Sequence, residues 1–167
     1  MRVDMKNTQF FIKSVDQIVQ GTALVDDAEL QFVADANSVW ALHLDLINSA
    51  DDVADQNDRV QMAIKAPASA VVTVYTFAIV NDGTNGVTAP AQGPLVPASQ
   101  GTPGSPFAWG APGATVSPAY SWVRMAVLVK MGADPGPIGL QFGEVTSASA
   151  NGAVVYAGST LLARKAS

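Results

Sequence analysis

The chain has 167 residues, of which 49% are hydrophobic and 14% are charged, with 14 acidic and 9 basic side chains and no cysteine. This length suits one domain that buries its own core. The absence of cysteine excludes disulfides, thiolate metal sites and cysteine nucleophiles, and the acidic balance without a Lys or Arg cluster argues against nucleic acid as a partner. A charged fraction well below the usual quarter leaves a neutral surface that suits contacts with other chains.

Residues 1–8 are expected to form an N-terminal arm ahead of the first strand. The apolar stretch 10–12 that follows is too short for the core of a signal peptide, so no secretion signal is predicted. Apolar stretches elsewhere reach roughly ten residues, below the ~20 that a membrane helix needs, so no membrane partner is predicted.

Two segments in the first half of the chain alternate apolar and polar side chains with a period of two, which predicts half-buried strands. In segment 39–47 the apolar set begins at Trp40 and His43 lies on the opposite side. Segment 59–66 alternates in the same way and stops at Pro67, which cannot donate to a strand ladder.

Segment 71–80 is dense in β-forming residues on both faces, which predicts a central strand covered on both sides, and turn residues at 81–83 end it. Alternation returns in 122–130. A turn at 132–137 then leads to apolar residues spaced by two in 138–142, which predicts a hairpin. Shorter strands are expected at 9–15, 17–24, 29–34, 153–157 and 160–165.

No segment combines helical periodicity with a cap and a length above about ten residues; the nearest, 48–58, is at best a short turn of helix. About nine closely spaced strands without helices predict an all-β chain. The expected fold is one antiparallel β-sandwich domain over 1–167, jelly-roll-like, with a β-barrel as the next alternative.

Segment 81–121 holds seven of the ten prolines and one charged residue, Asp82. This composition predicts a long Pro/Gly-rich loop, well beyond the ~15 residues usual in compact domains. Because disordered linkers are charged or strongly polar, the apolar side chains here favour an arm ordered against a neighbouring chain over a floppy insertion. The predicted interface residues in and after the loop are Leu95, Phe107, Trp109 and Trp122. Such aromatic side chains could also stack on sugars, but a protein interface is favoured.

Segment 24–40 joins a short strand, a paired-Asp turn, a Leu-x-Phe strand and an Ala-Asn turn that leads into an aromatic-bearing strand. Segment 139–147 joins a Leu-Gln-Phe strand to a Thr-Ser loop, and 158–164 is a Gly-Ser-Thr-Leu closing strand. These features resemble a pattern recurrent in bacteriophage virion proteins. The resemblance covers the two ends of the chain and the strand before Pro67, whereas 81–121 has no counterpart.

The resemblance implies a β-sandwich building block of a phage particle, often trimeric, made in the host cytoplasm and located on the virion surface. The predicted function is a non-enzymatic virion structural protein that decorates the capsid. The alternative is a tail or fibre component with a glycan-binding or receptor-binding role. The expected partners are further copies of the chain, as a homotrimer, and the major capsid protein or other virion proteins.

His43 and Asp45 lie two apart on one strand face and, with a serine, could suggest a hydrolase triad. The chain has no Gly-x-Ser-x-Gly elbow and no second histidine. No catalytic residue, enzyme activity or cofactor is therefore predicted, and an esterase is the remotest alternative.

Four aspartates in segment 51–58 could offer oxygen ligands to calcium. Their spacing does not fit an EF-hand loop, so a solvated acidic turn is favoured over a metal site. Segment 81–86 is likewise interpreted first as a turn. The pair Asp26-Asp27 could bind a cation but is expected to bond its own backbone instead. No metal site is predicted.

Overall fold

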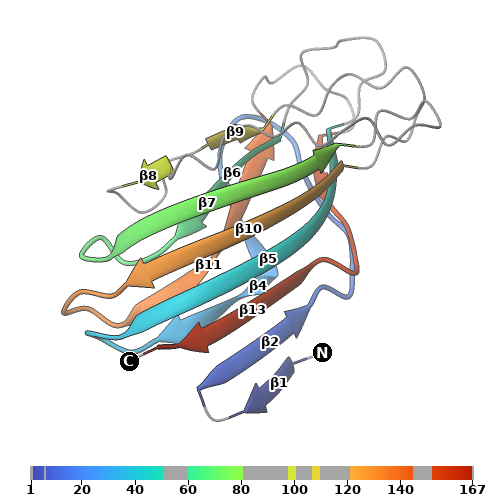
Figure 1. Ribbon diagram of the computed structural model, residues 1–167. Helices are drawn as coiled ribbons and strands as arrows, with labels where there is room; N and C mark the ends of the chain where they lie inside the picture. The colour runs from blue at the N-terminus through green and yellow to red at the C-terminus, as the bar shows by residue number, and fades with distance from the viewer. Residues whose placement is uncertain are drawn as a thin grey trace.

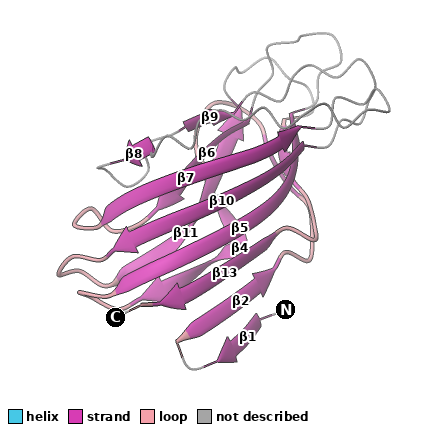
Figure 2. Cartoon of the chain, in the orientation of Figure 1, coloured by secondary structure: helices cyan, strands magenta, loops and turns pink. Residues whose placement is uncertain are grey.

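The computed structural model describes residues 2–5, 7–50, 60–80, 98–100, 107–109, 121–144 and 152–166. Every regular element in these ranges is a β-strand, and the strands form two antiparallel sheets (Figure 1; Figure 2). The predicted antiparallel β-sandwich is confirmed. In the described ranges no helix could cross a membrane. The strands are β1 (Arg2–Met5), β2 (Thr8–Ile12), β3 (Gln17–Val19), β4 (Val25–Ala34), β5 (Val39–Ala50), β6 (Val60–Lys65), β7 (Val71–Val80), β8 (Ala98–Gln100), β9 (Phe107–Trp109), β10 (Ser121–Lys130), β11 (Gly136–Glu144), β12 (Ala153–Val155) and β13 (Thr160–Lys165).

The large sheet has nine strands in the order β1-β2-β13-β5-β10-β7-β8, with β12 beside β5 and β3 beside β12. The small sheet has four strands in the order β4-β11-β6-β9. From β4 to β7 the chain crosses to the other sheet at every connection. This repeated crossing ties the two sheets together around a shared core.

The core lies between the sheets and contains the inward side chains of the alternating strands. The ring of Phe32 contacts those of Phe11 and Trp40, with centroids 6.1 and 4.8 Å apart. The indole N–H of Trp40 donates to Ser38 Oγ at 2.8 Å, which satisfies the polar group of a buried aromatic residue. The largest fully buried apolar side chains are Leu30, Leu42, Leu44, Leu46, Met62, Ile64, Met125, Ile138, Leu140, Phe142 and Leu161.

The predicted hairpin between segments 122–130 and 138–142 is wrong. Strand β10 pairs with β5 and β7 in the large sheet, whereas β11 pairs with β4 and β6 in the small sheet. The turn between them crosses from sheet to sheet beside the β4–β5 turn, and the N–H of Met131 donates to the carbonyl of Ser38 at 2.8 Å. A Cβ on Gly132 would lie 2.4 Å from the carbonyl oxygen of Ser69. Turn residues suit a hairpin and a crossing equally, and only tertiary packing decides between them.

Strand β7 matches the predicted bounds of 71–80, but it is neither central nor covered on both sides. It lies between β10 and the three-residue β8. Its outward side chains Val71 and Tyr75 are 51% and 40% exposed. Val71 and Tyr75 therefore belong to an exposed surface and not to a second core.

Two predicted loop segments contribute short strands. Residues 2–5 of the expected N-terminal arm form β1, which pairs with β2. Within 81–121, β8 pairs with β7 and β9 pairs with β6, so each extends one edge of a sheet. The remainder of that segment up to residue 120, like 51–59, lies outside the described residues.

Strand β4 runs through residues 26–27, where the sequence predicts a turn. The register against β11 shifts in this region, which marks a bulge. The Oδ1 atom of Asp27 accepts the N–H groups of Glu29 and Leu30, both at 2.9 Å. The expected bonding to the local backbone is confirmed for Asp27, although it occurs in a bulge. It is wrong for Asp26, whose carboxylate accepts from the side chains of Lys65 and Gln141 instead.

Asp27 also forms a buried ion pair that the sequence did not indicate. Lys13 follows β2, and its Nζ donates to Asp27 Oδ2 at 2.8 Å, with side-chain exposures of 1% and 0%. Gln17 Oε1 accepts from the same Nζ at 3.4 Å, and the Glu29 carboxylate lies 3.8 Å from it. Two charges removed from water depend on each other, so the pair links the end of β2 to β4.

Candidate protein-binding face

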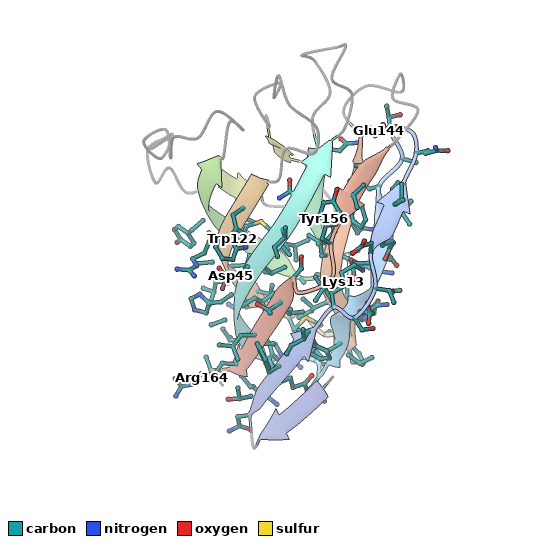
Figure 3. All side chains as sticks on the ribbon, turned by 90° about the vertical axis from the view of Figure 1, so that its right-hand side faces the viewer. Lys13, Asp45, Trp122, Glu144, Tyr156 and Arg164 are labelled. Carbon is teal, nitrogen blue, oxygen red and sulfur yellow. The ribbon has the colours of Figure 1, made fainter. Side chains whose placement is uncertain are left out.

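The outer face of the large sheet carries more exposed large apolar side chains than any other surface that the structure describes. We define this outer face as the outward side chains of β7, β10, β5 and β13. Figure 3 shows Trp122, Asp45 and Arg164 projecting on this side of the sheet. Its most exposed apolar members are Trp122 at 58%, Val71 at 51%, Leu128 at 43%, Tyr75 at 40% and Leu162 at 37%.

The pairing register makes side chains on this face direct neighbours. Tyr75 lies opposite Ala126, which lies opposite His43 on β5. His43 in turn lies opposite Leu162, and Leu162 opposite Phe10 on β2. Cross-strand neighbours on one face have Cβ atoms about 5 Å apart. The row therefore runs without a break across the sheet.

The charges on the outer face are mostly basic. Arg124 Nε donates to Asp45 Oδ1 at 2.6 Å across the β10–β5 pair. This hydrogen bond, with the attraction of the carboxylate, raises the pKa of Arg124. Lys130 and Arg164 are also exposed here, and neither makes an ion pair with a described residue. The outer face is therefore basic, in a chain whose net charge is −5.

The outer face of the small sheet is polar instead. Gln141 Nε2 donates to Asp26 Oδ1 at 2.8 Å, and Lys65 Nζ donates to the other oxygen of Asp26. The pKa of Asp26 is lowered, chiefly by this bond to Lys65. Gln61 donates to two backbone carbonyl groups. Among the strands of the small sheet, Val33 at 73% and Val25 at 42% are exposed apolar side chains. Since contiguous exposed apolar surface marks binding sites, the large sheet is the better candidate.

Of the four predicted interface residues, only Trp122 has a described side chain, and it lies on the outer face. Phe107 and Trp109 lie in β9, whose backbone pairs with β6 of the same chain. Their side chains, and the whole of Leu95, are outside the described part of the chain. Trp122 and β9 belong to different sheets, and the anchoring role of the loop residues stays a prediction.

The two residues considered for a hydrolase triad, His43 and Asp45, have other surroundings in the structure. Asp45 is the ion-pair partner of Arg124, and His43 is exposed among apolar neighbours. Within the described ranges, no group of three or more His, Asp or Glu side chains could hold a metal ion. The aspartates of 51–58 and the segment 81–86 fall outside those ranges. The expectation that the chain is not an enzyme stays a prediction.

Sequence reasoning missed Val71, Tyr75, Leu128 and Leu162 as members of the face. For β10 a signal was available, because the positions opposite the buried set include both Trp122 and Leu128. For β7 no such signal exists. Apolar residues on both faces of a strand suit double burial and an exposed binding face equally.

No protein-family model matches the chain, and no curated protein matches its sequence. Two solved structures of infectious bursal disease virus are similar at a low level. The likeness to the Gx strain has 10% identity and a TM-score of 0.22, over 96% of this chain and 40% of the other. The likeness to the Gt strain has 11% identity and a TM-score of 0.17, over 93% of this chain and 38% of the other. The chain thus spans about two fifths of their length. TM-scores this low do not indicate a common fold, so neither likeness bears on function.

Proposed function

We propose that the chain is a non-enzymatic structural protein of a virus particle, and that it binds other protein chains through the outer face of its large sheet. The observation that carries this proposal is the set of five large exposed apolar side chains that β7, β10 and β13 present on one face, with Lys130 and Arg164 among them. Large exposed apolar patches with a charged rim are typical of protein interaction sites.

The aromatic residues are the anchors of this surface. A buried aromatic side chain covers about 150–250 Å². Trp122 and Tyr75 are about half exposed, so covering the remainder at about 25 cal/mol per Å² contributes roughly 2–3 kcal/mol each in gross terms. Association costs about 4–15 kcal/mol before any net affinity appears. Several anchors must therefore be covered together, which a rigid sheet achieves without reordering.

Within this class, capsid decoration of a bacteriophage head is the finer proposal, in which the chain assembles as a homotrimer on the major capsid protein at the particle surface. Its support is the resemblance of segments 24–40, 139–147 and 158–164 to phage virion proteins. The apolar loop residues Leu95, Phe107 and Trp109 are proposed as further anchors on neighbouring chains.

A non-enzymatic role is supported by the chemistry of the face. The carboxylate of Asp45 is occupied by Arg124 at 2.6 Å. The single histidine of the chain, His43, is exposed to solvent on an open sheet. General acid–base catalysis needs a positioned group in a pocket, and a histidine on an open sheet is not placed in one.

A second candidate function is glycan binding, as in a tail or fibre protein. Trp122 and Tyr75 are exposed on the same face as the polar groups of His43, Arg124 and Asp45. Aromatic rings with polar groups between them can stack on sugars. A glycan array with intrinsic fluorescence as readout separates the two functions, because only glycan binding predicts a hit that Trp122→Ser removes.

The proposed function is tested by particle association. Mass spectrometry of separated heads and tails should find the chain at high copy on heads. Purified wild type and the Trp122→Ser variant are then each sedimented with particles that lack the protein, and the fractions bound to particles are compared. Val33→Ser on the small sheet is the matched control. We expect Trp122→Ser to bind at least about thirtyfold less tightly, as for a central anchor, and Val33→Ser to bind normally. Equal binding of both variants would overturn the proposal.

A further inference from the structure

Two flanks of the large sheet carry apolar residues with opposite charges. The first, which we call the basic patch, comprises Trp122, Arg124, Leu128 and Lys130 on β10 and the adjoining exposed side chains of β7. The outer face as a whole has three basic side chains, those of Arg124, Lys130 and Arg164, and one acidic side chain, that of Asp45. Taking these four from the 9 basic and 14 acidic side chains of the chain leaves 6 basic and 13 acidic elsewhere.

The second flank, which we call the acidic patch, comprises Val15 and Asp16 in the turn between β2 and β3, Ile18 on β3, and Glu29 on the adjoining strand β4 of the small sheet. Val15 and Ile18 are 62% and 61% exposed. In the large sheet, β2 is separated from β10 by β13 and β5, and β3 is separated from β10 by β12 and β5. The acidic patch therefore lies on the opposite flank of the sheet from the basic patch.

The carboxylates of the acidic patch are fixed in place. Glu29 accepts the Ser14 N–H at 3.0 Å and the Ser14 hydroxyl at 2.5 Å. The Ser14 hydroxyl bond is the main reason that the pKa of Glu29 is lowered, so the charge persists in mild acid. Asp16 Oδ1 accepts the N–H of Ala157 at 2.8 Å. Groups held in this way lose little freedom when a partner binds.

We infer that the basic patch of one copy binds the acidic patch of a second copy, head to tail. The inference rests on the proposed function, because it names the first partner of the same outer face. Charge complementarity favours this pairing, since apolar residues with Lys130 meet apolar residues with Asp16 and Glu29. A face-to-face dimer centred on the basic patch would instead bring two basic surfaces together. Head-to-tail contacts close into rings when the rotation permits, and a trimer is the ring expected here.

Mixing two variants tests the contact. Trp122→Glu disrupts the basic patch and Ile18→Glu disrupts the acidic patch, because each replaces an apolar contact residue by a charged one. Val33→Glu on the small sheet is the control. Light scattering should show a closed oligomer for wild type and for the control, and monomers for each patch variant alone. A mixture of the two patch variants keeps one intact pair of patches. It should form a one-to-one dimer and nothing larger, with an apparent Kd that increases with salt.

Thermal unfolding of each variant shows that it is folded before its assembly is interpreted. Ile18→Glu assembling like wild type would overturn the head-to-tail contact, and so would a monomeric wild type. A monomer that still attaches to particles through Trp122 would leave the proposed function standing while this inference fails. Normal attachment of Trp122→Glu to particles would sink the proposed function itself, whatever the oligomeric state.

Discussion

Replacing Asp27 by Asn should destabilise the domain strongly, because it leaves the buried ammonium of Lys13 without its partner. The substitution keeps Oδ1 as an acceptor for the two N–H groups of the β4 bulge, so the loss is confined to the charge. Breaking a buried ion pair costs about 3–5 kcal/mol. Glu29 remains 3.8 Å from Lys13 Nζ, which places the expected loss near the lower end, about 3 kcal/mol. This is a large part of a typical 5–15 kcal/mol.

Urea unfolding, followed by circular dichroism, gives the free energy of unfolding for a double-mutant cycle. Lys13→Met alone should cost about as much as Asp27→Asn, since it strands the carboxylate. The double variant should be less destabilised than the sum of the two, because no unpaired charge remains. The exposed pair Arg124–Asp45 is the control and should change stability least. The coupling would be refuted if the losses in free energy of unfolding of the two single variants simply add in the double variant. It would also be refuted if Asp27→Asn costs no more than breaking the Arg124–Asp45 pair.

Three further changes test other parts of the structure. Gly132→Ala should lower the free energy of unfolding by about 1–3 kcal/mol, because its Cβ would lie 2.4 Å from Ser69 O; an unchanged urea midpoint would argue against the close crossing. The pKa of Asp26 is lowered below its ordinary value of 3.8. The contribution of its carboxylate to the stability of the fold is therefore complete above that pH and is lost as pH falls through the folded pKa. Melting temperatures from about pH 5 to about pH 2 should therefore fall less steeply for Asp26→Asn than for wild type. Phe107→Ala with Trp109→Ala should weaken particle attachment more than thermal stability; a loss of stability alone would show that β9 serves only its own sheet.

Period-two alternation was enough to predict the long strands and the sandwich. It located β5, β6 and β10 to within a few residues, because each has one face against the core. Strand β7 was located instead by its run of β-forming residues. It could not assign β10 and β11 to different sheets, since that depends on the crossing turns at Gly132. It also could not find the Lys13–Asp27 pair, because nothing in the local sequence shows that a lysine after β2 points inward.

The candidate face was only partly predictable. Trp122 is an aromatic residue at an outward position of an alternating strand, which the sequence shows directly. Tyr75 and Val71 lie in a strand that is apolar on both sides, so their exposure depends on which strands the sheet leaves uncovered. The position of Leu162 in the same row as Tyr75 depends on the pairing of β13 with β5, of β5 with β10 and of β10 with β7, which only the fold establishes.

Hydroxyl-radical footprinting tests most directly whether the outer face is the surface buried in the particle. Oxidation rates of individual side chains are compared by mass spectrometry between free protein, kept monomeric by Ile18→Glu, and assembled particles of wild type. We expect Trp122, Tyr75 and Leu128 to be protected severalfold on assembly, while Val33 on the small sheet reacts as it does in the free protein. Equal oxidation of Trp122 in the free and assembled states, or protection at Val33 instead, would contradict the assignment of this face.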